Sequence, residues 1–173
     1  MAGDTDAFGF FYDEYAKKIY SYVMFRTSDT ELSQDITHDV FLQAWQYIQE
    51  KKSIRNLQAL VYRMAHNKIV DFYRLKDRTP VLLPDEHPSK VNHQVEIEIK
   101  GDIQLLRQRI LQLKEEYQNI LTLRHMEGLS IDEISIVLGK DKNNVRVLLH
   151  RAFIKLQALY LPIDSHDTQD SQN

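Results

Sequence analysis

Residues 129–155 constrain the fold most, because they contain the signals for two short helices and a tight turn. Ser130 followed by Glu133 is a capping box, in which a hydroxyl and a carboxylate accept hydrogen bonds from free backbone donors at a helix start. Gly139 can supply the turn, since glycine adopts the left-handed conformation readily. Asp141 can then cap a second helix. The pattern predicts a helix-turn-helix.

Both predicted helices have an apolar face. The first would bury Ile131, Ile134, Val137 and Leu138, and the second Val145, Leu148, Leu149, Ala152 and Leu156. The other faces of the second helix carry side chains that suit DNA phosphates and base edges. This set is Lys142, Asn143, Asn144, Arg146, His150, Arg151 and Lys155. Taken alone, the stretch could also be an ordinary pair of core helices with a solvated basic face.

Positive charge is concentrated in two blocks of an acidic chain. The 173 residues have a formal net charge of -3. Residues 51–78 carry eight Lys or Arg against two Asp or Glu, and residues 140–155 carry five against one. Two separated basic blocks predict two nucleic-acid contacts, with acidic surfaces left for protein partners or for solubility.

What the composition lacks excludes several classes of protein. Cysteine is absent, so disulfides and thiolate metal sites are excluded. No basic leader with an apolar core begins the chain, and no apolar run approaches membrane-spanning length. The seven histidines form no metal-ligand pair at helical spacing, and neither a glycine-rich phosphate loop nor a nucleophile motif is present. We therefore expect a cytoplasmic, non-enzymatic protein without membrane insertion, cofactor or metal.

The first fifty residues predict two amphipathic helices. An aromatic stripe over residues 7–25 indicates a helix with core-facing rings. A second helix over residues 30–47 has an acidic ridge opposite its apolar face, formed by Asp35, His38, Asp39 and Leu42. Carboxylates beside an exposed leucine are typical of a protein-docking edge, and a merely solvated face is the alternative.

A basic loop and a third helix follow, over residues 51–56 and 57–76. Their basic, amide and aromatic side chains are Lys51, Lys52, Arg55, Arg63, Asn67, Asp71, Tyr73, Arg74 and Arg78, with Tyr62 alongside. Such a face suits single-stranded nucleic acid, because guanidinium groups hold the backbone while rings and amides engage unstacked bases. An Arg-rich solvated helix is an equal alternative.

Three prolines, Pro80, Pro84 and Pro88, predict an extended linker after this helix. Beyond it, apolar spacing favours helices over residues 95–113 and 115–125. The expected fold is all-α, with two small helical domains joined by a flexible linker. The expected parts are an N-terminal domain (1–78), the linker (79–93), a C-terminal helix-turn-helix domain (94–161) and a disordered tail (162–173).

Almost the whole chain, from about residue 8 to residue 161, resembles the extracytoplasmic-function (ECF) group of bacterial RNA polymerase sigma factors. Three motifs in the family's order carry the resemblance. SQDITHDVFLQAW is similar to the polymerase-binding helix, and LVYRMAHNKIVDFYR to the promoter-melting helix. Residues 115–156 are similar to the helix-turn-helix domain.

The resemblance implies a role for each surface. The ridge at Asp35, His38 and Asp39 falls where family members contact the clamp helices of the polymerase. The basic loop and the third helix, with Asn67 and Asp71, fall where they open a promoter element and capture its non-template strand. The last helix falls where they read an element further upstream. The implied partners are core RNA polymerase, promoter DNA and an anti-sigma protein, which commonly wedges between the two domains.

Four positions depart from the family pattern. Leu60 stands where an aromatic residue is common, His38 where glutamine is common, and His66 and Leu148 where arginine is common. The last two remove positive charge near DNA and bear on promoter preference. They leave the function class unchanged.

A stand-alone helix-turn-helix regulator is the alternative function, with N-terminal helices that bind a ligand or dimerise. Such a protein would bind duplex DNA without polymerase, and it would need neither the acidic ridge nor a second basic block. The three motifs favour a sigma factor that binds core polymerase, recognises two promoter elements and assists DNA opening.

Overall fold

The structure is a computed structural model of the chain and describes residues 2–50, 54–78 and 101–160. Within these ranges every regular element is a helix, which confirms the all-α prediction. The predicted linker (79–93), the predicted tail (162–173), Lys51 and Lys52 lie outside the described residues. Among the helices that are described, none is long and apolar enough to cross a membrane.

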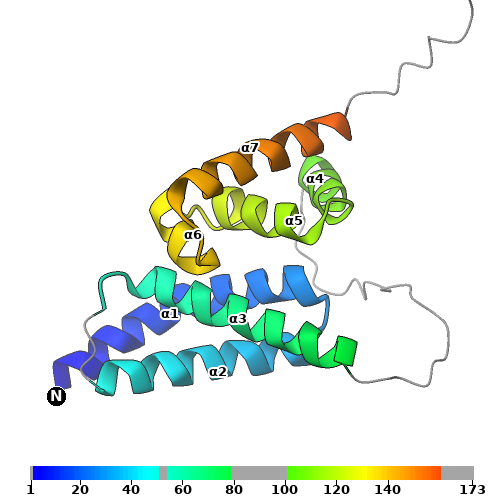
Figure 1. Cartoon of the computed structure of the whole chain (residues 1–173). Coiled ribbons are helices and arrows are strands. Elements are labelled where there is room, and N and C mark those ends of the chain that lie inside the picture. Colours follow the sequence, from blue (N-terminus) through cyan, green and yellow to red (C-terminus); the bar gives the residue numbers. More distant parts are fainter. Residues whose placement is uncertain (1, 51–53, 79–100, 161–173) are drawn as a thin grey trace, which may run out of the picture.

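Helices α1 (Ala2–Thr27), α2 (Thr30–Gln49) and α3 (Leu57–Arg78) form the N-terminal half (Figure 1). Helix α2 begins at the predicted break, where the Asp29 side chain accepts a hydrogen bond from the Leu32 backbone N–H. Most of the aromatic stripe of α1 is core, as predicted: Tyr22 is fully buried, and the Phe8 ring centroid lies 5.0 Å from that of Trp45. Tyr12 is the exception, because it is 44% exposed. Aliphatic side chains fill the rest of this core, including Ile19, Val23, Val40, Val61 and Ile69.

The C-terminal half contains α4 (Gly101–Leu111), α5 (Glu115–Leu121), η1 (Thr122–Met126), α6 (Ile131–Leu138) and α7 (Lys142–Ala158). Residues 95–100 of the predicted first helix lie outside the described part. The helix predicted over residues 115–125 is an α-helix only as far as Leu121. Its last turn widens into the π-helix η1, closed by the Glu127 N–H donating to the Thr122 carbonyl at 3.0 Å.

The helix-turn-helix forms as its local signals predict. The Ser130 hydroxyl accepts from the Glu133 N–H at 3.2 Å, and the Glu133 carboxylate accepts from the Ser130 N–H at 2.7 Å. Gly139 has φ +62°, a left-handed conformation that disfavours a side chain. The Asp141 carboxylate accepts from the backbone N–H groups of Asn143 and Asn144, and so it caps α7.

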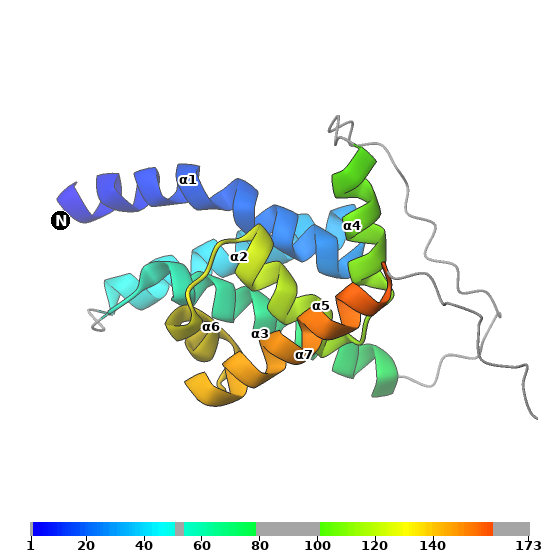
Figure 2. The same ribbon diagram turned by 90° about the horizontal axis from the view of Figure 1, so that it is seen from above.

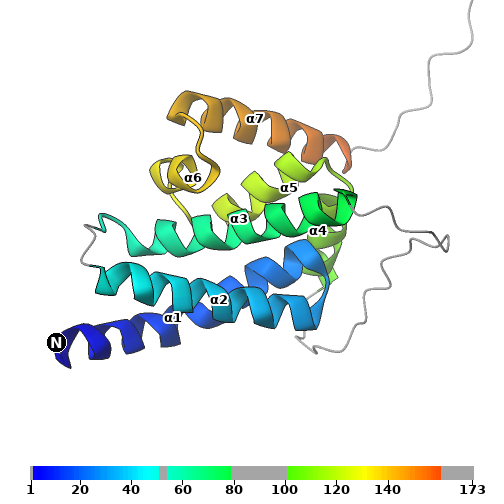
Figure 3. The same ribbon diagram turned by 60° about the horizontal axis from the view of Figure 1, so that its bottom comes forward.

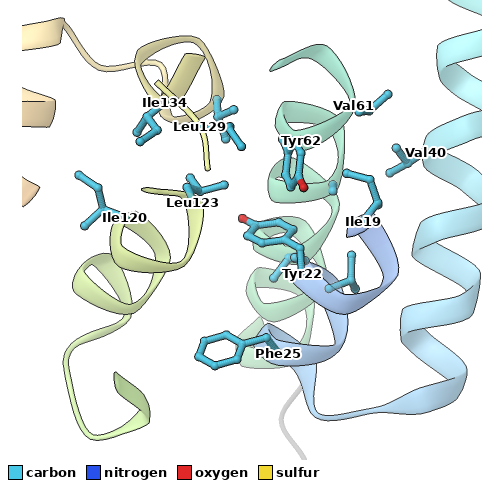
Figure 4. Close-up of a cluster of buried hydrophobic side chains, with 14 of the residues drawn as sticks. Ile19, Tyr22, Phe25, Val40, Val61, Tyr62, Ile120, Leu123, Leu129 and Ile134 are labelled. Carbon is cyan, nitrogen blue, oxygen red and sulfur yellow. The ribbon is translucent and has the colours of Figure 1, made fainter. Parts of the chain in front are cut away.

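The two halves pack directly against each other. Helix α3 lies between α2 and α6, as Figure 3 shows, and α3 contacts α6 extensively. The view from above shows α5 and α7 lying across α3, with α4 at the end where α1 finishes (Figure 2). One cluster of buried side chains runs through both halves, with Tyr22 and Tyr62 facing Leu123, Leu129 and Ile134 (Figure 4). The halves therefore share a core.

Candidate protein-docking and nucleic-acid interfaces

The acidic ridge lies on the outer face of α2. Asp35, His38, Asp39 and Leu42 are all exposed, and the Leu42 side chain is 50% exposed although it is a large apolar group. Helix α2, which carries the ridge, lies on the opposite side of the molecule from α7 (Figure 1). Sequence reasoning missed one member of this surface: Lys68 of α3, whose Nζ lies 2.9 Å from the Asp39 carboxylate. No local pattern links the two residues, because they lie on different helices.

The basic face of α3 is exposed along its length. Arg63, Asn67, Asp71 and Arg74 have exposed side chains, and so has Arg55 in the preceding loop. The side chain of Arg78 lies outside the described ones. The face thus presents guanidinium, amide and carboxylate groups to solvent on one side of the helix.

The two tyrosines predicted near this face are placed differently. Tyr73 is half-buried, and its hydroxyl donates to the Arg26 backbone carbonyl at 3.1 Å. Tyr62 is fully buried, and its hydroxyl donates to the Glu127 carboxylate of the C-terminal half. The expectation that Tyr62 lies beside the nucleic-acid face is wrong, because the C-terminal half covers that side of α3.

The polar set of α7 is exposed. Lys142, Asn143, Asn144, Arg146, His150, Arg151 and Lys155 all have exposed side chains. Neighbours within the helix-turn-helix hold the first turn in place: the Lys142 ammonium lies 2.7 Å from Asp132, and Arg146 donates to the Asn143 amide oxygen at 3.0 Å. Asn144 also donates to Asp141. The helix therefore presents an ordered, positively charged face.

A fourth polar region, which sequence reasoning missed, joins the halves. Asn56 donates to the Glu133 carboxylate at 2.9 Å, and the Tyr62 hydroxyl donates to Glu127. A second group of links surrounds Asn119 at the other end of the interface. It comprises Tyr22 with Asn119, Asn119 with His66, and the Arg26–Glu115 ion pair. We call these five pairs the junction.

Burial perturbs the titration of junction groups. Burial raises the pKa of Glu127 above its ordinary value, although the hydrogen bond from Tyr62 opposes this effect. Burial and the nearby Glu127 carboxylate raise the pKa of Tyr62. Burial would also raise the pKa of Glu133, but the hydrogen bonds from Ser130 and Asn56 hold it below its ordinary value. The pKa values of these groups therefore depend on the packing between the halves.

Within the described ranges, no group of three or more His, Asp or Glu side chains could hold a metal ion. The arrangement instead offers three separate exposed faces. One is acidic and partly apolar, one is basic on a helix, and one is basic on a helix-turn-helix.

Two parts of the sequence match known protein families. Residues 11–79 match the Sigma-70 region 2 family, and residues 103–156 match Sigma-70 region 4. Together these matches cover most of the chain and define a sigma-70 protein that carries regions 2 and 4. The chain belongs to the extracytoplasmic-function sigma factors, which initiate transcription, and it is not a stand-alone helix-turn-helix regulator.

Curated relatives agree with this placement. The ECF RNA polymerase sigma factor BldN of Streptomyces coelicolor is 29% identical over 171 residues, covering 95% of this chain but 64% of BldN. The RNA polymerase sigma factor YlaC of Bacillus subtilis is 28% identical over 151 residues, covering 84% of this chain and 87% of YlaC. This chain therefore spans about two thirds of one relative and most of the other.

Solved structures share the fold. The sigma factor RpoE, in complex with the anti-sigma factor NepR from Bartonella quintana, has a TM-score of 0.68 at 17% identity, covering 89% of this chain and 96% of RpoE. CnrH, in complex with the cytosolic domain of CnrY, has a TM-score of 0.66 at 21% identity, covering 92% and 90%. Helices of the N-terminal half are hereafter called region 2, and those of the C-terminal half region 4.

Proposed function

We propose that this chain binds core RNA polymerase through the ridge on α2 and positions it at promoters through the basic faces of α3 and α7. The observation that supports this proposal most is that the three faces are exposed and separate. Polymerase and two DNA segments can therefore be engaged without competing for the same side chains. The ridge residues Asp35, His38, Asp39 and Leu42 are assigned to polymerase.

The α3 face would capture the displaced DNA strand. Each stacked step of duplex DNA is worth on the order of 1 to 2 kcal/mol, so a small protein cannot simply pull the strands apart. It can bind bases that have opened spontaneously and so shift the equilibrium towards the open state. Arg63, Asn67, Asp71 and Arg74 are exposed for this role. The proposed site also includes Tyr73, which is half-buried, and Lys51, Lys52 and Arg78 by sequence.

The α7 face would read the upstream promoter element. Asn143, Asn144 and Arg146 lie in the first turns of the helix, and His150, Arg151 and Lys155 extend the polar face. Guanidinium and amide groups discriminate bases in the major groove, whereas lysines hold phosphates. About 4 to 6 phosphate contacts from both regions predict that binding weakens steeply as salt concentration rises.

An anti-sigma protein is a proposed partner. Of the two similar structures named above, one is by its title a sigma factor in complex with an anti-sigma factor, and the other is CnrH in complex with the cytosolic domain of CnrY. In this chain regions 2 and 4 already contact each other. An inhibitor that wedges between them would have to displace the junction. We further propose that the chain acts without catalysis of its own and in the cytoplasm, where core polymerase works.

Two substitutions test the division of labour between the faces. We expect Asp39→Ala to weaken binding to bacterial core polymerase about tenfold or more while leaving binding to promoter duplex unchanged, because a charged rim contact is lost. Arg146→Ala should do the reverse and cost about 1–3 kcal/mol in discrimination of one base pair. Polymerase pull-down and transcription from a promoter library measure both effects.

Matched controls keep this test sharp. Asp13→Ala and Lys17→Ala remove exposed charges of α1 outside the proposed faces and should change neither readout. Circular dichroism must show unchanged helix content in all four variants. Transcripts that need both the chain and core polymerase support the proposal. Duplex binding with no polymerase association would overturn it.

A further inference from the structure

His66 occupies a position that the nucleic-acid face does not use. It stands on the promoter-melting helix where arginine is common in the family, yet its ring does not point to the exposed basic side of α3. It is half-buried against region 4, and its Nδ1 lies 3.2 Å from the side-chain nitrogen of Asn119 on α5. The residue belongs to the junction.

The hydrogen-bond chain through Asn119 defines the protonation state of His66. The buried Tyr22 hydroxyl donates to the Asn119 amide oxygen at 2.8 Å, so the NH₂ group of that amide faces His66. An NH₂ group can only donate, and His66 Nδ1 must therefore present a lone pair. The packed state requires a neutral imidazole whose proton is on Nε2.

Protonation of His66 would place two donors against each other. Turning the Asn119 amide over would satisfy the imidazolium, but it would also take the acceptor away from the buried Tyr22 O–H. Leaving a buried hydroxyl without an acceptor is unfavourable. Neither amide orientation satisfies all three residues once His66 carries a second proton.

The charges around His66, taken together, also disfavour its protonated form. His66 lines a cavity of about 210 Å³ between the halves, together with Arg26 from α1, Glu115 and Glu116 from α5, and Lys140 from the turn after α6. The Arg26 side chain is 2% exposed, and it is paired with Glu115. Burial and the Arg26 charge lower the pKa of His66, and Glu115 opposes them.

We propose that His66 is a pH-sensitive joint between regions 2 and 4, so that protonation of its imidazole favours separation of the two regions. The pKa of His66 is higher in the separated state, where it approaches the value of about 6.5 for a free imidazole. The separated state therefore binds more protons than the packed state. Acidification below that value therefore favours separation. The inference concerns the packing of the chain and does not depend on the proposed function.

In the packed state the pKa values of two junction carboxylates are shifted in opposite directions. Glu127 has a raised pKa in the packed state, so its protonation would favour packing, opposite to His66. Glu133 has a lowered pKa, so its protonation would favour separation. Comparison of the wild type with a variant that lacks the imidazole therefore separates the contribution of His66 between pH 8 and about pH 5.5 from that of these carboxylates.

The test measures the distance between regions 2 and 4 by energy transfer in the full chain. Since the chain has no cysteine, Lys17→Cys on α1 and Gln157→Cys on α7 give two unique, exposed labelling sites. We expect the ratio of separated to packed molecules to rise between pH 8 and pH 5.5, by at most about tenfold per pH unit for one proton. His66→Gln keeps an acceptor for Asn119 without a titrating ring, and it should remove most of this rise.

Controls distinguish His66 from general acid effects. Glu127→Gln should retain the pH response, because it leaves the His66–Asn119–Tyr22 chain intact. If His66→Gln responds to pH as the wild type does, or if the wild type does not respond, the proposal is overturned. Nuclear magnetic resonance of the wild-type imidazole gives an independent readout should His66→Gln fail to fold. An Nε2–H tautomer at pH 7.5 supports the joint, and an Nδ1–H tautomer contradicts it.

Discussion

At the scale of single residues, some side chains have surroundings in the folded molecule that differ from those predicted by their spacing in the sequence. Tyr62 has the spacing of a residue beside the basic face of α3, but it is fully buried and donates to Glu127. Its ring also packs edge-on against Tyr22, with centroids 5.5 Å apart. Helix α3 has two covered sides, one against α1 and α2 and one against region 4. The spacing of residues within α3 shows which of them share a side of the helix, but it does not show which other helix covers that side.

The Tyr62 hydroxyl is predicted to stabilise the fold through Glu127. Tyr62→Phe removes the donor and leaves a largely buried carboxylate unpaired by it, which costs about 1–3 kcal/mol. Urea unfolding followed by circular dichroism measures the loss. Tyr160→Phe alters a tyrosine that is 47% exposed and should cost far less. Equal losses in the two variants would contradict a special role for the pair.

At the scale of elements, caps explain where helices begin and how they meet. Asn56 precedes α3, and its side-chain oxygen accepts from the Ala59 N–H at 2.8 Å. Its amide nitrogen donates to Glu133, which is itself part of the capping box of α6. One residue thus caps α3 and joins that cap to the start of the helix-turn-helix. The capping box of α6 was predictable from Ser130 and Glu133, but its connection to Asn56 was not.

Two substitutions of Asn56 separate its capping role from its linking role. Asn56→Ala removes both functions, and we expect it to cost about 1–2 kcal/mol. Asn56→Asp keeps an oxygen that can cap α3, but it loses the donor and sets a second carboxylate beside Glu133. We expect Asn56→Asp to destabilise the fold at pH 7, where both carboxylates are charged, and to recover towards acidic pH. Chemical unfolding at pH 7 and pH 4.5 measures the difference, and a pH-independent effect of Asn56→Asp would argue against the link.

At the scale of the whole molecule, regions 2 and 4 share one core. Leu129 and Ile134 of region 4 and Tyr22 and Tyr62 of region 2 belong to the same buried cluster. Contiguous apolar packing of this kind couples the stability of its parts. The three faces proposed to bind polymerase and DNA lie around this core: α2 is on one side and α7 on the other, with α3 between α2 and α6 (Figures 1 and 3).

A substitution in region 4 should therefore be felt in region 2. Leu129→Ala creates a cavity in the shared core and should cost about 2–5 kcal/mol. Trp45 of α2 is the single tryptophan of the chain, so its fluorescence reports region 2 alone. We expect Leu129→Ala to lower the urea midpoint of Trp45 fluorescence together with that of helix content.

Leu105→Ala, at a leucine of α4 that is 42% exposed, provides the matched control and should shift both midpoints only slightly. A Trp45 midpoint that stays in place while helix content falls earlier would show that the two regions unfold independently. Coincident transitions in both variants are the result expected of one shared core.

The sequence by itself determined the all-α class, the helix-turn-helix with its caps and turn, and the exposure of the ridge and both basic faces. These features depend on residues a few positions apart, whose spacing along a helix decides which side they face. Only the tertiary structure decided that regions 2 and 4 pack together through Asn56, Tyr62 and His66. Their partners lie 53 to 77 positions away in the chain. No local pattern encodes such a pairing, because it arises when two separately predicted apolar surfaces are buried against each other.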